Sequence, residues 1–124
     1  LYNKARQDAA RKYSAAFDGH KNIIAPQICD ICDCHVFHQY TLRIIDADRN
    51  GLMQHLLDKG IPCAIYYPIP LHAQKAYLDE RYKEEDFPVT NQLVTEVLSL
   101  PMHTELDDEQ IKFITTSVLE FLDK

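Results

Sequence analysis

The sequence lacks the long apolar runs and the surplus of positive charge that would place the protein in a membrane or on nucleic acid. No apolar stretch approaches the roughly 20 residues of a membrane-spanning helix, and no signal peptide opens the chain. The 13 basic and 19 acidic side chains give a net charge of −6. Because phosphate binding needs a basic face, this balance argues against a nucleic-acid partner. We therefore expect a cytoplasmic protein without membrane or nucleic-acid partners.

The chain also lacks internal repeats, low-complexity tracts and an interdomain linker. Its 124 residues are 46% hydrophobic and 26% charged, which is typical of one globular domain with a core of moderate size. No Ser-His-Asp set or pair of carboxylates can be recognised. Lys59, Lys75 and Lys83 lie in polar contexts, without the desolvated or cation-flanked surroundings that a Schiff-base lysine needs. We expect no catalytic residue in this chain.

The spacing of the apolar residues predicts the secondary structure. Helical spacing predicts helices at 1–17, 49–59, 72–80, from Thr90 to Val97 and from Asp107 onward. Alternation predicts strands at 35–45, 61–67 and 98–100, with a short extended piece at Ile23 and Ile24. Asp48 is expected to cap the second helix and Gly60 to end it. Asp107 and Gln110 resemble a capping box.

These elements predict the α+β class, with a small, mostly antiparallel or mixed sheet and helices packed over one face. In the first long strand, alternation places Val36, Tyr40, Leu42 and Ile44 on one face. The strand–helix–strand unit over 35–67 favours a right-handed crossover. The strand at 98–100 then has two possible places, between the first two strands or beside them.

The stretch from Gly60 to His72 is the most informative part of the sequence. Its β-rich start ends on Tyr66 and Tyr67, and Pro68 and Pro70 follow at once. Proline removes a ladder donor and keeps the preceding residue extended. The sequence therefore predicts two aromatic rings at a strand end, where binding groups often lie on a rigid frame.

Three runs together carry a family resemblance. They are His-Gln-Tyr-Thr at 38–41, the stretch 60–72 with its Gly-Ile-Pro and Tyr-Tyr-Pro-Ile-Pro-Leu-His, and Leu-Ser-Leu-Pro-Met-His at 98–103. In this order and spacing they resemble the C-terminal part of the DegT/DnrJ/EryC1/StrS sugar aminotransferases. The resemblance extends from Ala5 to Ile111 and thus covers nearly the whole chain.

The resemblance implies a parent enzyme that uses pyridoxal phosphate to move an amino group, typically from glutamate, to a nucleotide-linked keto sugar, as in polysaccharide biosynthesis. Residues 1–124 would be its C-terminal small domain, similar to that of fold-type I aminotransferases. Family members are much longer, and their cofactor lysine belongs to an N-terminal domain without a counterpart here. The chain alone is then expected to bind no cofactor and to be inactive, with that domain and a second subunit of a homodimer as partners.

The resemblance also implies which residues contact substrate. The His-Tyr-Pro run of the family reaches a nucleotide-sugar site, and Tyr66, Tyr67 and, less specifically, His72 and Gln74 stand at matching positions. Tyr66 departs from the family's frequent histidine, and a phenol stays neutral below about pH 10. Strand alternation would put the two tyrosines on opposite faces. For His72, a loop histidine that bonds backbone groups is the alternative interpretation.

The cysteines support a different interpretation. Cys29, Cys32 and Cys34 form a Cys-x-x-Cys-x-Cys cluster, and thiolates at this spacing can bind zinc. A freestanding binding or interaction module that holds zinc is therefore the alternative to the aminotransferase fragment. A structural zinc site usually takes its second ligand pair from a separate knuckle, and Cys63 stands alone. We expect free, reduced thiols and no bound metal.

Overall fold

The computed structural model describes residues 1–27 and 34–124. Its helices are α1 (Tyr2–Phe17), α2 (Arg49–Asp58), α3 (Pro88–Glu96) and α4 (Asp108–Leu122). Its strands are β1 (Ile23–Ile24), β2 (Tyr40–Ile44) and β3 (Val97–Leu100), and short 3-10 helices lie at Leu71–Ala73, Lys75–Tyr77 and Glu84–Asp86. Within these ranges no helix is long and apolar enough to cross a membrane.

The strands form one antiparallel sheet in the order β1-β2-β3. Leu42 pairs with Leu98 and Tyr40 with Leu100, so the buried residues of the two longer strands share a face. The predicted α+β class with a mostly antiparallel sheet is confirmed. On its other edge β3 pairs with Ala64, which places it between β2 and the segment 61–67, one of the two predicted positions.

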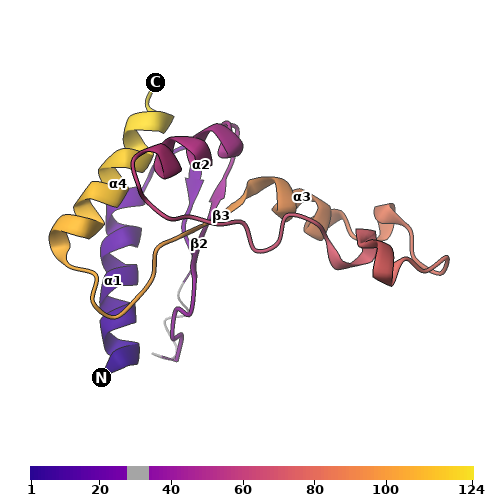
Figure 1. The fold of residues 1–124 in the computed structure, drawn as a ribbon, viewed down its shortest axis with the longest axis horizontal. Coiled ribbons are helices and arrows are strands. Elements are labelled where there is room, and N and C mark those ends of the chain that lie inside the picture. Colours follow the sequence, from indigo (N-terminus) through magenta and orange to yellow (C-terminus); the bar gives the residue numbers. More distant parts are fainter. Residues whose placement is uncertain (28–33) are drawn as a thin grey trace.

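The core lies between this face of the sheet and the helices α1, α2 and α4, of which α4 contacts both others (Figure 1). Tyr13 and Phe17 of α1, Leu52 of α2 and Val118 of α4 are almost wholly inaccessible to solvent. The helix α3 lies on the far side of the sheet from α1 and α4 and contacts β2 (Figure 1). Apart from α3, no helix of the described residues lies on the face opposite the core, which is called the uncovered face below.

The predicted helix ends are confirmed where a cap was recognised. The Asp48 carboxylate accepts the Gly51 N–H at 2.9 Å. Asp107 and Gln110 form the reciprocal capping box at 2.7 and 3.1 Å. Gly60 follows α2 with a φ of 74°, a conformation that glycine adopts without steric cost. These contacts are local, which is why the sequence indicates them.

Three expected elements differ in the structure. The predicted strand 61–67 is wrong apart from Ala64, which pairs with Ser99, because Pro62 and Pro68 have no N–H for a ladder. The predicted helix 72–80 is two 3-10 turns, since this segment buries no apolar face that would stabilise a helix. The helix predicted to begin at Thr90 begins at Pro88, which suits a first helical position.

Residues 66–87, called the arm below, extend away from the core (Figure 1). Large apolar side chains of the arm are between 47% and 71% exposed, namely Tyr66, Tyr67, Ile69, Leu71, Tyr77, Leu78 and Tyr82. Residues 81–86 are exposed. The arm packs mainly on itself, with the His72 ring stacked on Phe87 at 4.3 Å. A surface this apolar is unusual in a monomer and marks an interaction site.

Candidate functional site

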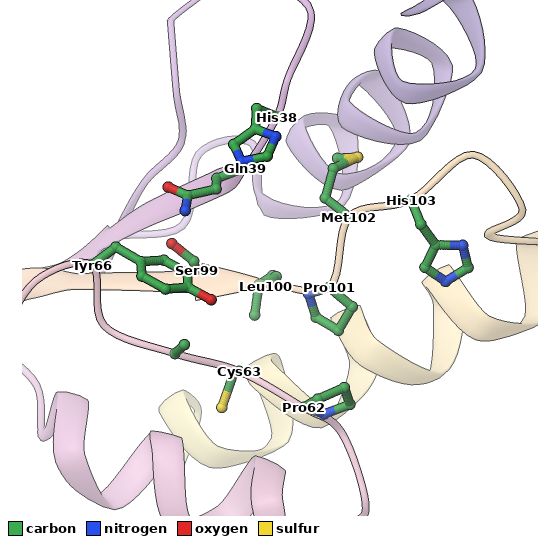
Figure 2. Close-up of a pocket in the computed structure, with 11 residues that line it drawn as sticks. His38, Gln39, Pro62, Cys63, Tyr66, Ser99, Leu100, Pro101, Met102 and His103 are labelled. Carbon is green, nitrogen blue, oxygen red and sulfur yellow. The ribbon is translucent and has the colours of Figure 1, made fainter. Parts of the chain in front are cut away.

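A cavity of about 340 Å³ lies where β2 begins, β3 ends and the chain enters the arm (Figure 2). It is lined by His38, Gln39, Pro62, Cys63, Ala64, Tyr66, Ser99, Leu100, Pro101, Met102 and His103. These residues come from the three runs that carry the family resemblance. Segments up to about 60 residues apart in the chain therefore meet at one cavity.

The cavity offers neutral polar groups among apolar walls. His38, Gln39, Tyr66 and Ser99 supply imidazole, amide and hydroxyl groups, and none of the described residues that line the cavity is a carboxylate, lysine or arginine. Hydroxyl and amide groups donate and accept hydrogen bonds without carrying charge. The arrangement is typical of a site for an uncharged polar ligand with an apolar face, such as a sugar ring.

Ser99 forms a rigid part of the wall. Its backbone exchanges hydrogen bonds with Ala64 at 2.8 and 3.1 Å, and its hydroxyl lies 2.7 Å from that of Thr41. Only 4% of Ser99 is exposed. Because β-strand side chains alternate, Ser99 points to the face opposite the buried Leu98 and Leu100. The cavity therefore lies on the uncovered face of the sheet.

Buried tyrosines hold the end of β3. The Tyr13 hydroxyl donates to the Pro101 carbonyl at 3.0 Å, across 88 residues of chain. The Tyr13 and Tyr40 rings lie 4.9 Å apart, and the Tyr40 hydroxyl lies 2.9 Å from that of Ser14. Burial raises the pKa of both phenols above the ordinary value. Both hydroxyls are therefore neutral at pH 7 and act as structural hydrogen-bonding groups.

His103 lies at the edge of the cavity with a defined tautomer (Figure 2). Its Nδ1 accepts the Glu105 backbone N–H at 3.2 Å. A neutral imidazole that accepts at Nδ1 carries its proton at Nε2. His103 thus offers a donor to whatever contacts the exposed end of β3.

The four predicted substrate-binding residues do not share one site. Tyr66 lines the cavity, whereas Tyr67 and Gln74 line a separate hollow of about 470 Å³ on the arm. The two tyrosine rings are edge-on at 74°, so they face different surroundings. His72 stacks on Phe87, and its buried Nε2 has no hydrogen-bond partner in the part of the chain that the structure describes. Substrate contact by any of the four stays a prediction.

Sequence reasoning missed several lining residues. His38 and Gln39 were recognised only as part of a family run and not as site residues, yet both are exposed and line the cavity. Ser99 and Met102 were not singled out, although both lie in the run 98–103. The sequence did contain a signal for these residues, since all of them belong to the three runs that resemble the family. Segments that form one site tend to be recognisable together.

The cysteine predictions have a mixed outcome. Cys34 is disulfide-bonded, so the prediction of a free thiol is wrong at this position, and an oxidised sulfur is no thiolate ligand. Cys29 and Cys32 lie outside the described residues. Cys63 is free, and burial raises the pKa of its thiol. No cluster of metal-ligating side chains occurs among residues 1–27 and 34–124.

The lysines considered for cofactor binding lie at the surface. Lys59 pairs with Glu120 and donates to the Ser117 hydroxyl at 3.4 Å. Lys83 lies 3.8 Å from Glu85, and Lys75 is exposed. These surroundings do not fit a Schiff-base lysine.

Comparison with known proteins agrees with the resemblance. The profile of the DegT/DnrJ/EryC1/StrS aminotransferase family matches residues 1–119. The chain is 35% identical over 114 residues to UDP-2-acetamido-2-deoxy-3-oxo-D-glucuronate aminotransferase of Pseudomonas aeruginosa, covering 91% of this chain and 30% of the relative. It is 41% identical over 87 residues to a pleiotropic regulatory protein of Geobacillus stearothermophilus, covering 70% and 23%.

Solved structures match the fold closely. DesV of S. venezuelae, determined in complex with a ketimine intermediate, gives a TM-score of 0.89 at 29% identity, with 99% of this chain and 32% of DesV covered. A DegT DnrJ EryC1 StrS aminotransferase from Brucella abortus gives 0.86 at 31% identity, with 99% and 32% covered. The chain therefore spans about a third or less of the relatives that it matches, and corresponds to a C-terminal portion of them.

Proposed function

The chain belongs to the DegT/DnrJ/EryC1/StrS aminotransferase family, and we propose that it is the C-terminal small domain of an enzyme that transfers an amino group to a nucleotide-linked keto sugar. Residues 1–124 form this single domain, and glutamate is the proposed amino donor. The observation that carries the proposal is the meeting of the three family runs at one cavity on the uncovered face of the sheet.

The cavity forms a wall of the sugar site in this proposal. Gln39, Ser99 and Tyr66 contact sugar hydroxyl or acetamido groups, and Pro101 and Met102 lie against the apolar face of the ring. Among the described residues, no lysine or arginine lines the cavity, so the proposal places the diphosphate outside it, against basic groups elsewhere in the enzyme. Binding and orientation of the substrate are the contributions of this chain to catalysis.

Pyridoxal phosphate supplies the electron sink of the reaction in such enzymes. The lysines named above are paired or exposed, and their surroundings do not fit the cofactor. We assign the cofactor lysine to a part of the enzyme outside these residues and assign no catalytic step to this chain. The chain alone neither forms an internal aldimine nor transaminates.

The arm is the surface that contacts the partners in this proposal. Its exposed apolar side chains become buried against the remaining part of the enzyme or against a second subunit of a homodimer. Burial of apolar surface contributes about 25 cal/mol per Å² removed from water. The isolated chain therefore self-associates through surface that the longer enzyme covers.

The reading frame that contains this sequence provides the test. The complete polypeptide is purified and assayed with pyridoxal phosphate, glutamate and a UDP-linked 3-keto sugar. We expect amino transfer to the sugar, and a frame that encodes no domain with a cofactor lysine refutes the proposal. In the same experiment the 124-residue chain is treated with cofactor and borohydride, and a stable adduct at one specific lysine contradicts the role assigned to this domain.

A further inference from the structure

Phe37 has a backbone conformation that its residue type rarely adopts. Its φ is 47°, in the left-handed region, which is sterically unfavourable for a residue that has a Cβ. Only 1% of Phe37 is exposed, while the neighbouring Val36 is 43% exposed. Sequence alternation predicted Val36 in the core. Because of the left-handed conformation of Phe37, the Phe37 side chain points into the core in place of Val36.

Contacts from two other residues hold this conformation. The His35 Nδ1 accepts the Phe37 N–H at 3.0 Å, and the His35 ring lies 4.1 Å from the Phe37 ring. The amide of Gln7, 7% exposed on α1, donates to the His35 carbonyl at 3.1 Å. Inside the core, the Phe37 ring lies 6.3 Å from that of Tyr40. The turn at residues 35–37 is therefore held by α1 on one side and by the core on the other.

The turn decides where the next two side chains point. In a continuous strand, adjacent residues face opposite sides of the sheet. Here Phe37 and Tyr40 are both buried, and the two residues between them, His38 and Gln39, both line the cavity. Figure 2 shows His38 and Gln39 on the same side of the cavity. A regular strand would present only one of them.

We propose that Phe37 is a positioning residue of the cavity, and that its left-handed backbone, held by the Nδ1 of His35, presents His38 and Gln39 to the ligand together. The inference rests on the proposed function only in taking the cavity as the ligand site. Tyr40 connects this turn to Tyr13, whose hydroxyl holds Pro101 on the opposite part of the wall. Both parts of the cavity are thus set by one group of buried aromatic rings.

Two matched pairs of variants of the complete polypeptide test the proposal by NMR spectroscopy. Phe37→Gly and Phe37→Ala both remove the ring, but only glycine adopts a positive φ without steric cost. His35→Ala removes the acceptor, whereas the side-chain oxygen of His35→Asn can accept an N–H two residues on, as in an Asx turn. The readouts are the resonances of His38, Gln39 and Tyr66, and the affinity for UDP-N-acetylglucosamine as the probe.

We expect Phe37→Gly to shift the cavity resonances less than Phe37→Ala does, and His35→Asn to keep the wild-type resonances that His35→Ala shifts. Probe affinity should fall on the order of tenfold in His35→Ala and return in His35→Asn. Equal shifts in Phe37→Gly and Phe37→Ala, or unchanged resonances in His35→Ala, overturn the proposal. If Phe37→Ala does not fold, the His35 pair decides, because that side chain is exposed.

The same data separate this inference from the proposed function. A wild-type chain that shows no response to the probe counts against the sugar site. The resonance pattern of the variants without probe still decides the role of Phe37, because it reports the arrangement of the cavity wall directly.

Discussion

Replacing Tyr13 with phenylalanine isolates the hydrogen bond that holds the end of β3. The Tyr13 ring is inaccessible to solvent, and its hydroxyl donates to the Pro101 carbonyl at 3.0 Å. Tyr13→Phe keeps the ring contacts with Tyr40 and Phe17 and removes only the donor. A net hydrogen bond contributes about 1 kcal/mol, and an acceptor left unsatisfied in a buried place costs about 1–3 kcal/mol.

We therefore expect Tyr13→Phe to lower the free energy of unfolding by about 1–2 kcal/mol. In a domain of this size, 1 kcal/mol corresponds to a fall in Tm of about 4 °C. The value lies near the lower end of the range for an unsatisfied acceptor because Pro101 is only partly buried. The cavity resonances of Met102 and His103 should shift as well, since the carbonyl next to them loses its partner.

Urea denaturation followed by circular dichroism measures the loss. The matched control is Tyr77→Phe, the same chemical change at an arm residue that is 59% exposed, for which we expect a change within about 0.5 kcal/mol. If Tyr13→Phe unfolds at the same urea concentration as the wild type, the hydroxyl does not hold Pro101 and the reasoning is refuted. Unchanged resonances at Met102 would refute the link to the cavity.

Three further predictions concern ionisation and association. Burial raises the pKa of the Tyr13 and Tyr40 phenols in the folded protein. Their contribution to stability is therefore complete below about pH 10, the pKa of tyrosine in the unfolded chain, and is lost as the pH rises above it. Tyrosinate absorbance should rise together with unfolding. Burial also raises the pKa of the Cys63 thiol. Iodoacetamide at pH 8 should therefore alkylate Cys63 at least about tenfold more slowly in the folded chain than in urea. Equal alkylation rates, measured by peptide mass spectrometry, would contradict the burial of Cys63. Leu78→Glu on the arm should weaken self-association, measured by sedimentation, by at least about tenfold, or about 1.4 kcal/mol, with little change in Tm. Leu57→Glu on α2 is the control, because Leu57 is also an exposed apolar residue. Equal effects of the two substitutions would exclude the arm as the interface.

Much of the fold could be predicted because its signals are local. The amphipathic stripe of α1, the Asp48 cap of α2 and the capping box of α4 each depend on residues within one or two turns. Such patterns are visible in the sequence, and the structure confirms them with small changes at the ends. The three family runs likewise indicated the family and the α+β class without coordinates.

The segment after α2 shows where local patterns fail. Residues 61–67 alternate as a strand does, but only Ala64 finds a partner, at Ser99, 35 residues farther along the chain by their numbers. Strand formation depends on that distant partner and on the ladder donors that Pro62 and Pro68 lack. The predicted helix 72–80 failed for a related reason, since no part of the core covers its apolar side chains.

The sequence by itself determined the family, the main helices and the tyrosines at the start of the arm. The tertiary structure decided that Tyr66 lines the cavity and Tyr67 does not, and that Phe37 rather than Val36 enters the core. The physical reason is the range of the interactions. Helix caps and periodicity depend on neighbours a few residues away, whereas the cavity depends on contacts such as that of the Tyr13 hydroxyl with Pro101, 88 residues along the chain.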